Sequence, residues 1–353
     1  MSTPPHLLSV ALTRGHFELD LEISWQERVS VFFGPSGAGK STLFEALLGL
    51  HPTARARVCI GGEWLEDSET GLRRPTWQRG LGWVPQDPTL FPHLDVEANL
   101  RFAGPDAQTL ERAVEVLELR PLLTRDVRDL SGGERQRVAI GRALGSGPRA
   151  LLLDEPLASL DVTRRANVLR DLIRVRDALE LPMLVITHDP DEAQLLGERV
   201  AVIEAGRIVA SGAPAEVLWS RAVLPLSEAL GLENVLEGNS VAGVERCLVT
   251  DGGLRLALPV ATTAGVRMSV GVRAEDVVLA VDPPGRISAR NVLPARVTHC
   301  EPTGDDAFVH LALDPGGERL VAKLTAAAVR KLELHADTRV HALIKAQAIR
   351  RLA

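Results

Sequence analysis

Residues 29–41 read VSVFFGPSGAGKS, an apolar run that leads into a glycine-rich loop ending in lysine and serine. The loop matches the pattern GxxxxGK(S/T), which holds phosphate groups when it joins a strand to a helix. Its glycines let backbone N–H groups curl around a phosphate, and the following helix contributes its positive N-terminal end. The loop consists of Gly34, Pro35, Ser36, Gly37, Ala38, Gly39, Lys40 and Ser41. The pattern predicts a nucleoside triphosphate site in which Lys40 neutralises the β and γ phosphates and Ser41 ligates Mg²⁺.

Apolar runs alternate with helical patterns from Val29 to Val209, which favours an α/β fold with a largely parallel sheet. The runs that predict buried strands are Val29–Phe33, Leu81–Val84, Ala150–Leu153, Leu184–Thr187 and Val200–Glu204. The stretch from Asp95 to Leu144 indicates a helical insertion, with its clearest amphipathic segment over Ala107–Glu118. The sequence thus predicts a phosphate-binding domain at 1–230 with a helical subdomain at about 95–145.

An acidic pair follows one of the predicted strands. The run ALLLDEP at 150–156 brings Asp154 to the carboxyl edge of the sheet, where ligands of open α/β sheets bind. Asp154 is expected to hold Mg²⁺, directly or through water. Glu155, the next residue, is in position to polarise an attacking water as general base. A strand ending in an acidic helix cap is the alternative, but the phosphate loop upstream favours the catalytic interpretation.

A third motif, LSGGERQ at 130–136, predicts a second anion-binding helix start. Ser131 has the character of an N-cap, while Gly132 and Gly133 are expected to leave the first N–H groups of a helix at Gln136–Leu144 bare. This helix start has no lysine beside it. A phosphate receptor of that kind makes sense if it closes on a nucleotide held by another subunit.

Residues 1 to about 230 resemble the ATPase of the ATP-binding-cassette (ABC) family, because these motifs occur in that family's order. The resemblance implies that the domain binds and hydrolyses ATP with Mg²⁺. It also implies that Gln86 contacts Mg²⁺ and the water, and that His188 contacts the γ phosphate. Ser159–Asp161 resembles the loop that crosses the dimer interface. Taken singly, a glutamine or a histidine is more often structural, so the order and spacing of the motifs carry these roles.

Two further features follow from the resemblance. The family usually stacks adenine on an aromatic residue near the N-terminus, often tyrosine, and this chain has no tyrosine. Phe17 and His16 are the candidates, although Phe17 is equally consistent with the core of a β-strand. Phe91–Leu94, shortly after Gln86, resembles the edge of a groove that receives a cytoplasmic helix of the permease. Exposed apolar side chains there fit a partner site, and they are also consistent with packing of the insertion.

Beyond about residue 231, short β-rich runs separated by Gly, Pro and Asp favour a small barrel-like module. A faint repeat lies within it. The matching strings are ENVL at 233–236 with RNVL at 290–293, and VRAEDV at 272–277 with IKAQAI at 344–349. Two related β units, at 231–287 and 288–353, explain these matches, but chance similarity of short strings explains them equally well.

The chain from Ser288 onward resembles the molybdate-binding Mop fold, a small all-β, OB-like domain. The strings that carry the resemblance are SARNVL at 288–293 and ALIKA at 342–346. In that family paired modules hold tetrahedral oxyanions, and Ser288, Arg290 and Lys345 match as candidate anion contacts. The stretch DEPLASLD at 154–161 also resembles molybdate importer ATPases. A barrel that only dimerises the ATPase is the alternative role for this module.

Composition restricts the class of protein. A chain of 353 residues with 45% hydrophobic residues and a formal charge of −6 is long enough for two or three domains and has no basic excess that favours nucleic acid. Its three cysteines, Cys59, Cys247 and Cys300, are scattered, which fits reduced thiols better than a disulfide framework or a zinc site. The sequence contains no run typical of a membrane span or a secretion signal, so we expect any membrane role to require a partner.

Together these patterns predict the ATPase subunit of an ABC importer. The expected state is a homodimer bound to integral membrane permease subunits at the cytoplasmic face of the cell membrane, with a periplasmic or extracellular oxyanion-binding protein contributing indirectly. Molybdate is the expected cargo, and sulfate, tungstate, polyamine and sugar are the alternatives. A soluble ABC ATPase acting on ribosomes or DNA is less consistent with one cassette and a short Lys40–Ser131 spacing. A molybdate sensor or storage protein leaves the catalytic set unexplained.

Overall fold

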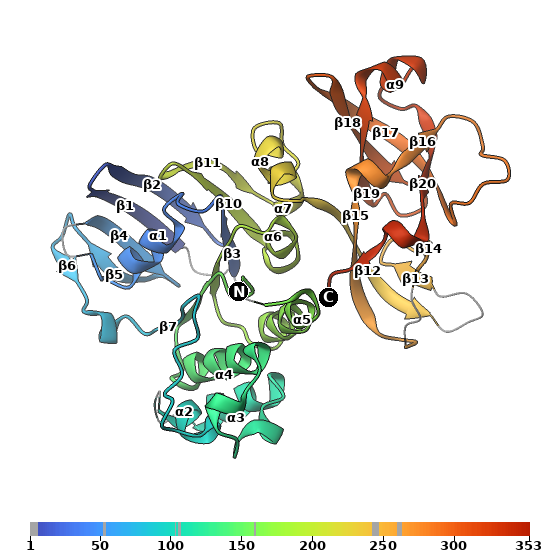
Figure 1. The fold of residues 1–353 in the computed structure, drawn as a ribbon. Helices are drawn as coiled ribbons and strands as arrows, with labels where there is room; N and C mark the ends of the chain where they lie inside the picture. The colour runs from blue at the N-terminus through green and yellow to red at the C-terminus, as the bar shows by residue number, and fades with distance from the viewer. Residues whose placement is uncertain are drawn as a thin grey trace. The chain divides into compact units, whose positions relative to one another are not determined.

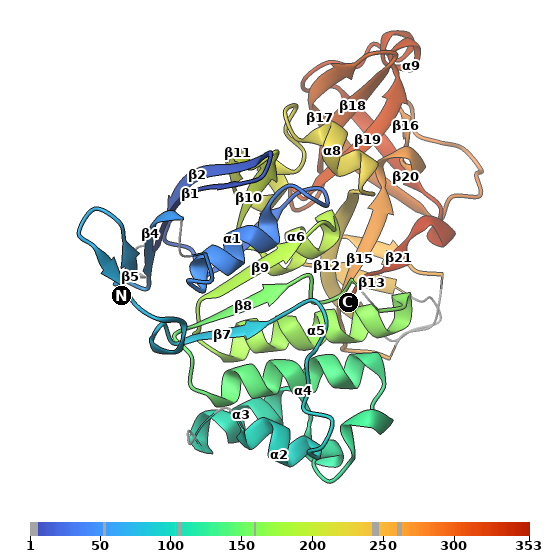
Figure 2. The ribbon, with the colours of Figure 1, turned by 60° about the vertical axis from the view of Figure 1, so that its left-hand side comes forward.

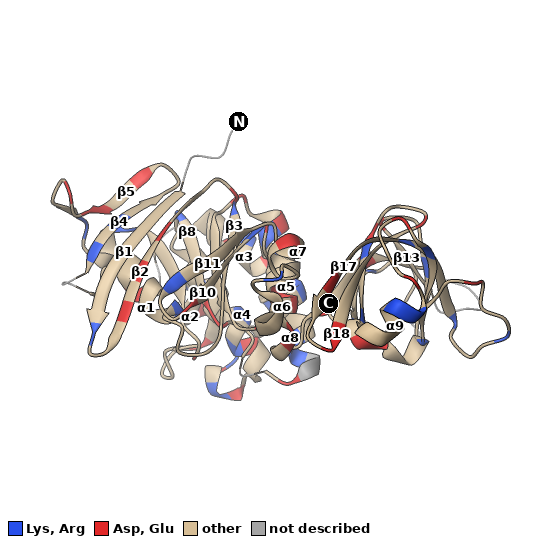
Figure 3. Ribbon diagram, turned by 90° about the horizontal axis from the view of Figure 1, so that it is seen from above, with Lys and Arg blue, Asp and Glu red and all other residues tan. Residues whose placement is uncertain are grey.

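The chain forms two compact units, Met1–Leu230 and Gly231–Ala353. The computed structural model describes residues 6–51, 54–102, 104, 107–158, 160–241, 247–259 and 263–353. None of the helices within these ranges is long and apolar enough to cross a membrane. Acidic and basic residues are interspersed along the elements of each unit (Figure 3), in keeping with the small formal charge of −6.

The centre of the first unit is a six-stranded, mostly parallel sheet (Figure 1). Its strands, in spatial order, are β11 (Arg207–Gly212), β10 (Arg199–Glu204), β3 (Val29–Phe33), β9 (Met183–Thr187), β8 (Ala150–Asp154) and β7 (Leu81–Val84). β11 runs antiparallel to β10, and the other neighbouring pairs are parallel. The five strands predicted from apolar runs are confirmed. Strands β3, β8 and β9 are buried along their whole length, which is why they read as continuous apolar runs.

A second sheet of the first unit is antiparallel, and the apolar runs did not predict it. Its order is β2 (Phe17–Trp25), β1 (His6–Arg14), β4 (Arg55–Ile60), β5 (Glu63–Asp67) and β6 (Leu72–Arg73). Burial alternates along β2 from Leu19 to Trp25, because one face of the strand packs on the core and the other is exposed. The alternation of apolar and polar residues in FELDLEISW is the sequence signal for this strand.

Helix α1 (Lys40–Leu47) packs between the two sheets, and its apolar side chains join theirs in one core. On the opposite face of the parallel sheet lie α5 (Val162–Ala178) and α6 (Pro190–Leu196). Figure 2 shows α1 and α5 on the two sides of the sheet. The N-terminus of α1, and the phosphate loop before it, therefore lie at the carboxyl ends of the parallel strands, where ligands of such sheets bind. Two short helices, α7 (Pro214–Val217) and α8 (Leu224–Ala229), complete the unit.

The helical subdomain lies to one side of the parallel sheet (Figure 1). It contains α2 (Val96–Arg101), α3 (Ala107–Val116), the 3-10 turns η2 (Arg120–Leu122) and η3 (Val127–Asp129), and α4 (Gly132–Gly145). The prediction that α4 spans Gln136–Leu144 is too short, because the helix begins at Gly132. The Ser131 hydroxyl accepts the Glu134 N–H, and the Glu134 carboxylate accepts the Ser131 N–H. This capping box extends the helix and engages an N–H group that the sequence suggested would be bare.

The second unit contains two five-stranded antiparallel sheets that share one core. The first sheet has the order β14 (Arg255–Ala257), β13 (Cys247–Thr250), β12 (Glu233–Val241), β15 (Arg267–Arg273) and β21 (Arg350–Arg351). The second has the order β16 (Val278–Ala280), β20 (Arg339–Ile344), β17 (Asn291–Thr303), β18 (Asp306–Leu313) and β19 (Arg319–Thr325). A short helix, α9 (Ala326–Lys331), follows β19. The expected all-β character of this part of the chain is confirmed.

The faint sequence repeat coincides with a duplication in the second unit. Asn234 pairs with Val272 between β12 and β15, and Asn291 pairs with Ile344 in the same way between β17 and β20. A 3-10 turn follows each second strand, η4 (Ala274–Asp276) and η5 (Ala346–Ala348). The strand after each turn then joins the other sheet, β16 beside β20 and β21 beside β15. The two repeats therefore exchange their last strands, which explains why they share a core.

Buried asparagines reinforce this exchange. The Asn234 side chain accepts the Val321 N–H and donates to the Val321 carbonyl. The Asn291 side chain makes the equivalent pair of hydrogen bonds with Ala257. Each asparagine thus ties the first strand of one repeat to an edge strand of the other, and buried amides of this kind are costly unless both their polar ends are satisfied.

Candidate functional site

A cavity of about 420 Å³ lies against the phosphate loop in the first unit. Its lining residues are Arg14, Phe17, Ser36, Gly37, Gly39, Lys40, Ser41, Thr42, Gln86 and Glu155. Eight of the residues proposed from the sequence thus meet around one space, although they come from four separate segments of the chain. Arg14 and Thr42 also line it, and sequence reasoning missed both. Thr42 directly follows the motif, whereas nothing in the motif indicates Arg14.

Lys40 lies buried at the floor of the loop. Its Nζ donates to the carbonyl oxygens of Gly34 and Pro35, each at 2.9 Å, and lies 3.7 Å from Glu155 Oε1. Burial lowers the pKa of Lys40, while the carboxylates of Glu155 and Asp154 oppose that effect. The ammonium group is therefore held inside the loop by two carbonyl oxygens and a nearby carboxylate.

Oxygen donors suited to a magnesium ion lie next to Lys40. The Ser41 hydroxyl donates to Asp154 Oδ1 at 3.3 Å, and the amide-bearing Gln86 lines the same cavity. Burial raises the pKa of Asp154, and the hydrogen bond from Ser41 partly offsets this. A hydroxyl, a carboxylate and an amide oxygen form the hard donor set that Mg²⁺ prefers, and this set fits the ion.

Glu155 connects the loop to His188. Its Oε2 lies 3.2 Å from His188 Nδ1, and its backbone N–H donates to the Ile186 carbonyl at 2.9 Å. The backbone φ of Glu155 is 45°, a left-handed value that non-glycine residues seldom adopt. Such strain persists where neighbouring structure fixes the residue, and it is common at functional sites. The carboxylate is thus held between the lysine and the histidine, and its role as general base stays a prediction.

A network behind His188 was missed by sequence reasoning. Glu192, which is buried, accepts a hydrogen bond from the Thr187 hydroxyl at 2.6 Å. Arg165 of α5 forms ion pairs with both Glu192 and Asp189. Thr187 and Asp189, which flank His188, are therefore both linked to Arg165. The link from Asp189 is direct, and the link from Thr187 runs through Glu192 of α6. Arg165 belongs to α5, the helix that follows the predicted interface loop Ser159–Asp161. The acidic residues could be found from their position after a strand, but Arg165 could not, since it comes from a different helix.

Strand β10 and the turn that follows it pack against the phosphate loop, and sequence reasoning missed this contact. A Cβ added at Gly34 would meet the Ile203 carbonyl oxygen at 2.1 Å, so only glycine fits there. Gly206 donates its N–H to the Ala38 carbonyl, and its own carbonyl accepts the Asp20 N–H. The loop's shape therefore depends on a hairpin far along the chain.

The signature residues Ser131, Gly132 and Gly133 are not among the described residues that line the cavity. A Cβ at Gly132 would contact the Leu160 side chain at 3.3 Å, and one at Gly133 would contact Val168 of α5 at 3.4 Å. The start of α4 thus packs against the region of the predicted interface loop. Ser159 of that loop lies outside the described residues.

Phe17 and His16, the two adenine candidates, differ in position. Phe17 lines the cavity, and its ring lies so close to Gly39 that a Cβ there would meet Phe17 Cζ at 2.6 Å. His16 is exposed in the turn between β1 and β2 and is not among the described lining residues. The geometry favours Phe17 as the aromatic wall beside the phosphate loop.

Phe91, in the segment that resembles a permease groove, packs beside an exposed aromatic side chain. The Phe91 ring lies 4.2 Å from the Phe102 ring, between centroids, and Arg142 lies over the Phe91 ring at 5.1 Å. Phe102 is 63% exposed, whereas Phe91 is partly covered. The coverage of Phe91 is the packing role given to Phe91–Leu94, and its role as a partner site stays a prediction.

The three oxyanion candidates of the second unit are exposed. Register continues from Asn291 and Ile344, so Arg290 and Lys345 lie opposite each other at the ends of β17 and β20. Ser288 belongs to the loop before β17. The structure therefore brings two of the three candidates to one strand end, with Ser288 nearby in sequence.

Comparisons with known proteins agree with this architecture. The ABC transporter family model matches residues 18–158, and the TOBE domain model matches residues 287–350. The solved structure of cbiO1 from Clostridium perfringens, part of the ABC transporter complex cbiONQ, superposes with a TM-score of 0.54 at 23% identity, over 66% of this chain and 96% of that one. The ADP conformation of MJ1267, an ATP-binding cassette of an ABC transporter, has a TM-score of 0.54 at 24% identity, over 66% and 100% of the two chains. These likenesses show the fold.

Curated relatives match over nearly the whole chain. Molybdenum import ATP-binding protein ModC of Albidiferax ferrireducens is 39% identical over 354 residues, covering 97% of this chain and 95% of its own. The protein of the same name from Bordetella pertussis is 40% identical over 344 residues, covering 94% and 93%. The matches extend across both compact units. The chain therefore belongs to the family of molybdenum import ATP-binding proteins, within the ABC transporter ATPases.

Proposed function

We propose that this protein hydrolyses ATP to drive molybdate import through membrane permease subunits. The observation that carries the proposal is the cavity in which Lys40, Ser41, Gln86 and Glu155 converge beside the phosphate loop. The relatives' names supply the cargo, since they are called molybdenum import proteins. The overall reaction is ATP + H₂O + external molybdate → ADP + phosphate + internal molybdate.

The phosphate loop is proposed to bind the triphosphate through its N–H groups and the Lys40 ammonium. Ser41, Asp154 and Gln86 are the residues that would hold Mg²⁺, because Ser41 and Asp154 are hydrogen-bonded to each other and Ser41 and Gln86 line the same cavity. When bound, the ion supplies positive charge that stabilises the phosphate oxygens. Phe17 offers its ring to the adenine base, and its contact with Gly39 supports this role.

Glu155 is proposed to act as general base. Its carboxylate accepts a proton from water as the water oxygen bonds to the γ phosphorus and the bond from that phosphorus to the ADP oxygen breaks. His188 Nδ1, which lies 3.2 Å from Glu155 Oε2, is proposed to orient the carboxylate and to contact the γ phosphate. Replacement of either residue removes an interaction that is needed mainly in the transition state.

The active form is proposed to be a C2 homodimer. Ser131, Gly132 and Gly133 of one copy complete the site formed by the phosphate loop of the other. Support comes from the cavity itself, which has no signature residue among its described lining, so one copy offers only half of a phosphate cage. ATP then closes the dimer and hydrolysis reopens it, a rigid-body switch that the permease converts into transport.

The location and the second unit complete the proposal. The protein is expected at the cytoplasmic face of the cell membrane, bound to integral membrane permease subunits, while an oxyanion-binding protein outside the membrane delivers the cargo. Residues 288–353 are proposed to form a Mop-like domain, with 231–287 as its first barrel unit. Ser288, Arg290 and Lys345 remain its candidate oxyanion contacts, and the adjacent ends of β17 and β20 support the pairing of the last two.

Uptake measurements test this function. Cells lacking this chain should take up molybdate poorly, and the wild-type chain should restore uptake, whereas Lys40→Ala should not. Lys331→Ala, which changes an exposed lysine of α9, serves as the matched control and should restore uptake fully. Sulfate and tungstate uptake are followed in parallel. Restoration of sulfate uptake without molybdate uptake would assign another cargo to the same machine.

A further inference from the structure

We propose that His299, Glu301 and His310 form a binding site for a divalent transition-metal ion, with zinc as the ion that fits best. The site lies in the second unit and takes no part in the nucleotide chemistry proposed above. It is the one group of three such ligand residues found within the described part of the chain.

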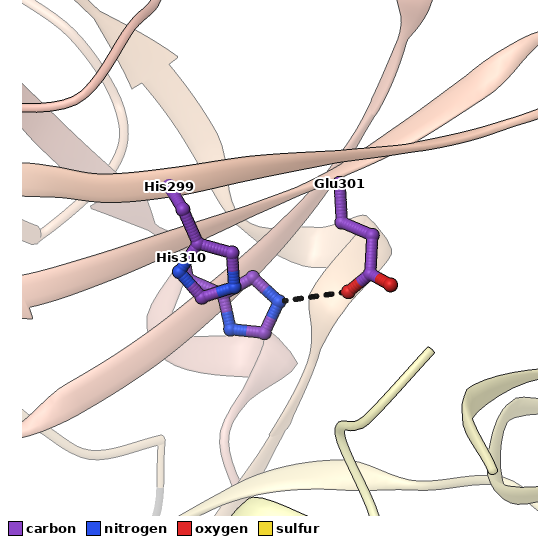
Figure 4. Close-up of side chains that lie close together, drawn as sticks. All are labelled: His299, Glu301 and His310. Atoms are coloured by element: carbon purple, nitrogen blue, oxygen red, sulfur yellow. Dashed lines mark ion pairs between the residues drawn. The ribbon is translucent and has the colours of Figure 1, made fainter. Parts of the chain in front are cut away.

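Two adjacent strands bring the ligands together. His299 in β17 pairs directly with His310 in β18, and Glu301 lies two residues beyond His299 on the same strand. A register shift between Val297 and His299 turns the strand there, so that His299 and Glu301 share a face with His310. Cys300 between them instead packs toward the core. Figure 4 shows the three side chains gathered together.

The distances suit a single metal ion. One ligand atom from each residue lies within 4.8 Å of the others, and His310 Nε2 is 3.8 Å from Glu301 Oε2. Ligand atoms bound to zinc at about 2.0–2.2 Å in a tetrahedron lie roughly 3.3 Å apart, so small side-chain movements suffice. The two imidazoles are stacked with centroids 3.9 Å apart. The exposed His299 ring must rotate so that its nitrogen converges with that of His310.

The chemistry of the donor set selects the class of ion. Two imidazoles and one carboxylate are typical ligands of zinc sites that keep a fourth position for water. Mg²⁺ and Ca²⁺ prefer sites made of oxygen ligands only, so they are expected to compete weakly. The site therefore differs in selectivity from the oxygen-rich site at Ser41 and Asp154.

A neighbouring hydroxyl orients the His299 imidazole for binding. The Thr298 hydroxyl donates to the His310 carbonyl at 3.1 Å, so its oxygen is available to accept a hydrogen bond from His299 Nδ1, which lies 3.4 Å away. This arrangement favours the tautomer in which His299 Nε2 has the lone pair.

Zinc titration of the full-length, tag-free protein tests the proposal. The titration competes with a chromogenic chelator and contains excess Mg²⁺, which keeps zinc from the nucleotide site. We expect one zinc ion per wild-type chain with an affinity that falls at least about tenfold in His299→Gln, Glu301→Gln and His310→Gln, because even outer-shell changes cost that much. His335→Gln, which alters another exposed histidine of the same unit, is the matched control and should bind zinc as the wild type does.

Cobalt(II) provides a second readout that does not depend on the absolute affinity. Wild type should give the intense visible absorption of a four-coordinate ion, and His299→Gln should lose it. Because His299 is exposed, this variant should keep the wild-type melting temperature in the absence of metal. Wild-type zinc affinity in both His299→Gln and His310→Gln would overturn the proposal, as would a cobalt spectrum unchanged by His299→Gln.

Discussion

Glu155 shows how much a single side chain depends on its surroundings. The residue next to it, Asp154, is buried and faces Ser41, whereas the Glu155 carboxylate lies between Lys40 and His188. Two adjacent acids thus have different nearest partners, and the second of them, Glu155, adopts a left-handed φ of 45°. The contacts of each acid therefore depend on how the fold places it and not on residue type alone.

Replacing Glu155 by Gln should preserve ATP binding and slow hydrolysis by at least about a hundredfold, since a general base commonly contributes that much. The amide keeps the shape of the side chain but cannot accept the proton from water. Phosphate release measures hydrolysis, and size-exclusion chromatography with ATP should reveal a persistent dimer. Glu180→Gln, an exposed change after α5, should behave as wild type. Normal turnover in Glu155→Gln would remove this carboxylate from the mechanism.

Phe17 and His16 allow a paired test of adenine binding. Phe17→Ala should weaken ATP binding by roughly tenfold, because stacking of a base on an aromatic ring contributes about 1–3 kcal/mol. His16→Ala should leave the affinity unchanged, since His16 is exposed in the neighbouring turn. Fluorescent-nucleotide titration gives both dissociation constants. Equal loss in the two variants would mean that the turn, and not the Phe17 ring, supports the nucleotide.

At the scale of elements, the contact between α5 and α6 links two loops of the site. Arg165 of α5 forms ion pairs with both Asp189 and Glu192. Burial, together with the Asp189 carboxylate, raises the pKa of Glu192 to about 7, and Arg165 opposes this only in part. The Glu192 carboxyl therefore keeps its proton to a higher pH than an ordinary glutamate does.

This raised pKa predicts a pH dependence of stability. Between the ordinary value of 4.5 and about 7, the folded state binds more protons at Glu192 than the unfolded state does, so stability falls as pH rises through that window. Glu192→Gln should flatten this part of the profile, by on the order of 1–3 kcal/mol across the window. Urea unfolding at a series of pH values measures the effect, with Glu180→Gln as control. An unchanged slope in Glu192→Gln would show that Glu192 ionises normally.

At the scale of the whole molecule, the proposed site belongs to two copies of the chain. Each copy would bind one nucleotide with its phosphate loop. It would contact the nucleotide of the other copy with the start of its helix α4. Ser131→Arg should therefore retain nucleotide binding and abolish hydrolysis, because the long side chain fills the space where the partner's phosphate enters. Ser131→Ala is the control for the lost helix cap, which is worth about 1 kcal/mol, and it should retain substantial activity.

Mixing two inactive variants separates sites shared between copies from sites within one copy. In a dimer of Lys40→Ala with Ser131→Arg, both defects fall in one site and the other site is intact. Half of randomly mixed dimers are of this kind, so about a quarter of the wild-type sites should return. ATPase assays of the mixture give the answer. A mixture as inactive as its components would refute the shared site.

Much of the first unit could be predicted because its signals are local. The phosphate loop, the strand that ends at Asp154 and the cap at Ser131 each depend on hydrogen bonds and φ values within a few residues. The buried strands of the parallel sheet stand out because both their faces are covered. The repeat around Asn234 and Asn291 was also visible in the sequence, because the matching strings are local. The sequence did not reveal that the two repeats exchange their last strands.

Tertiary structure alone decided the features that depend on strand register and on distant packing. Examples are the packing of Gly34 against Ile203 of β10, the pairing of Arg165 with Glu192, and the strand exchange in the second unit. The His299–His310 pair belongs here as well, because a one-residue bulge sets which face each side chain occupies. The sequence thus determined which chemical groups the chain carries and which local backbone conformation surrounds them. Packing between segments far apart in the chain determined which of those groups meet, because no short-range pattern records the register of a partner strand or the position of a partner helix.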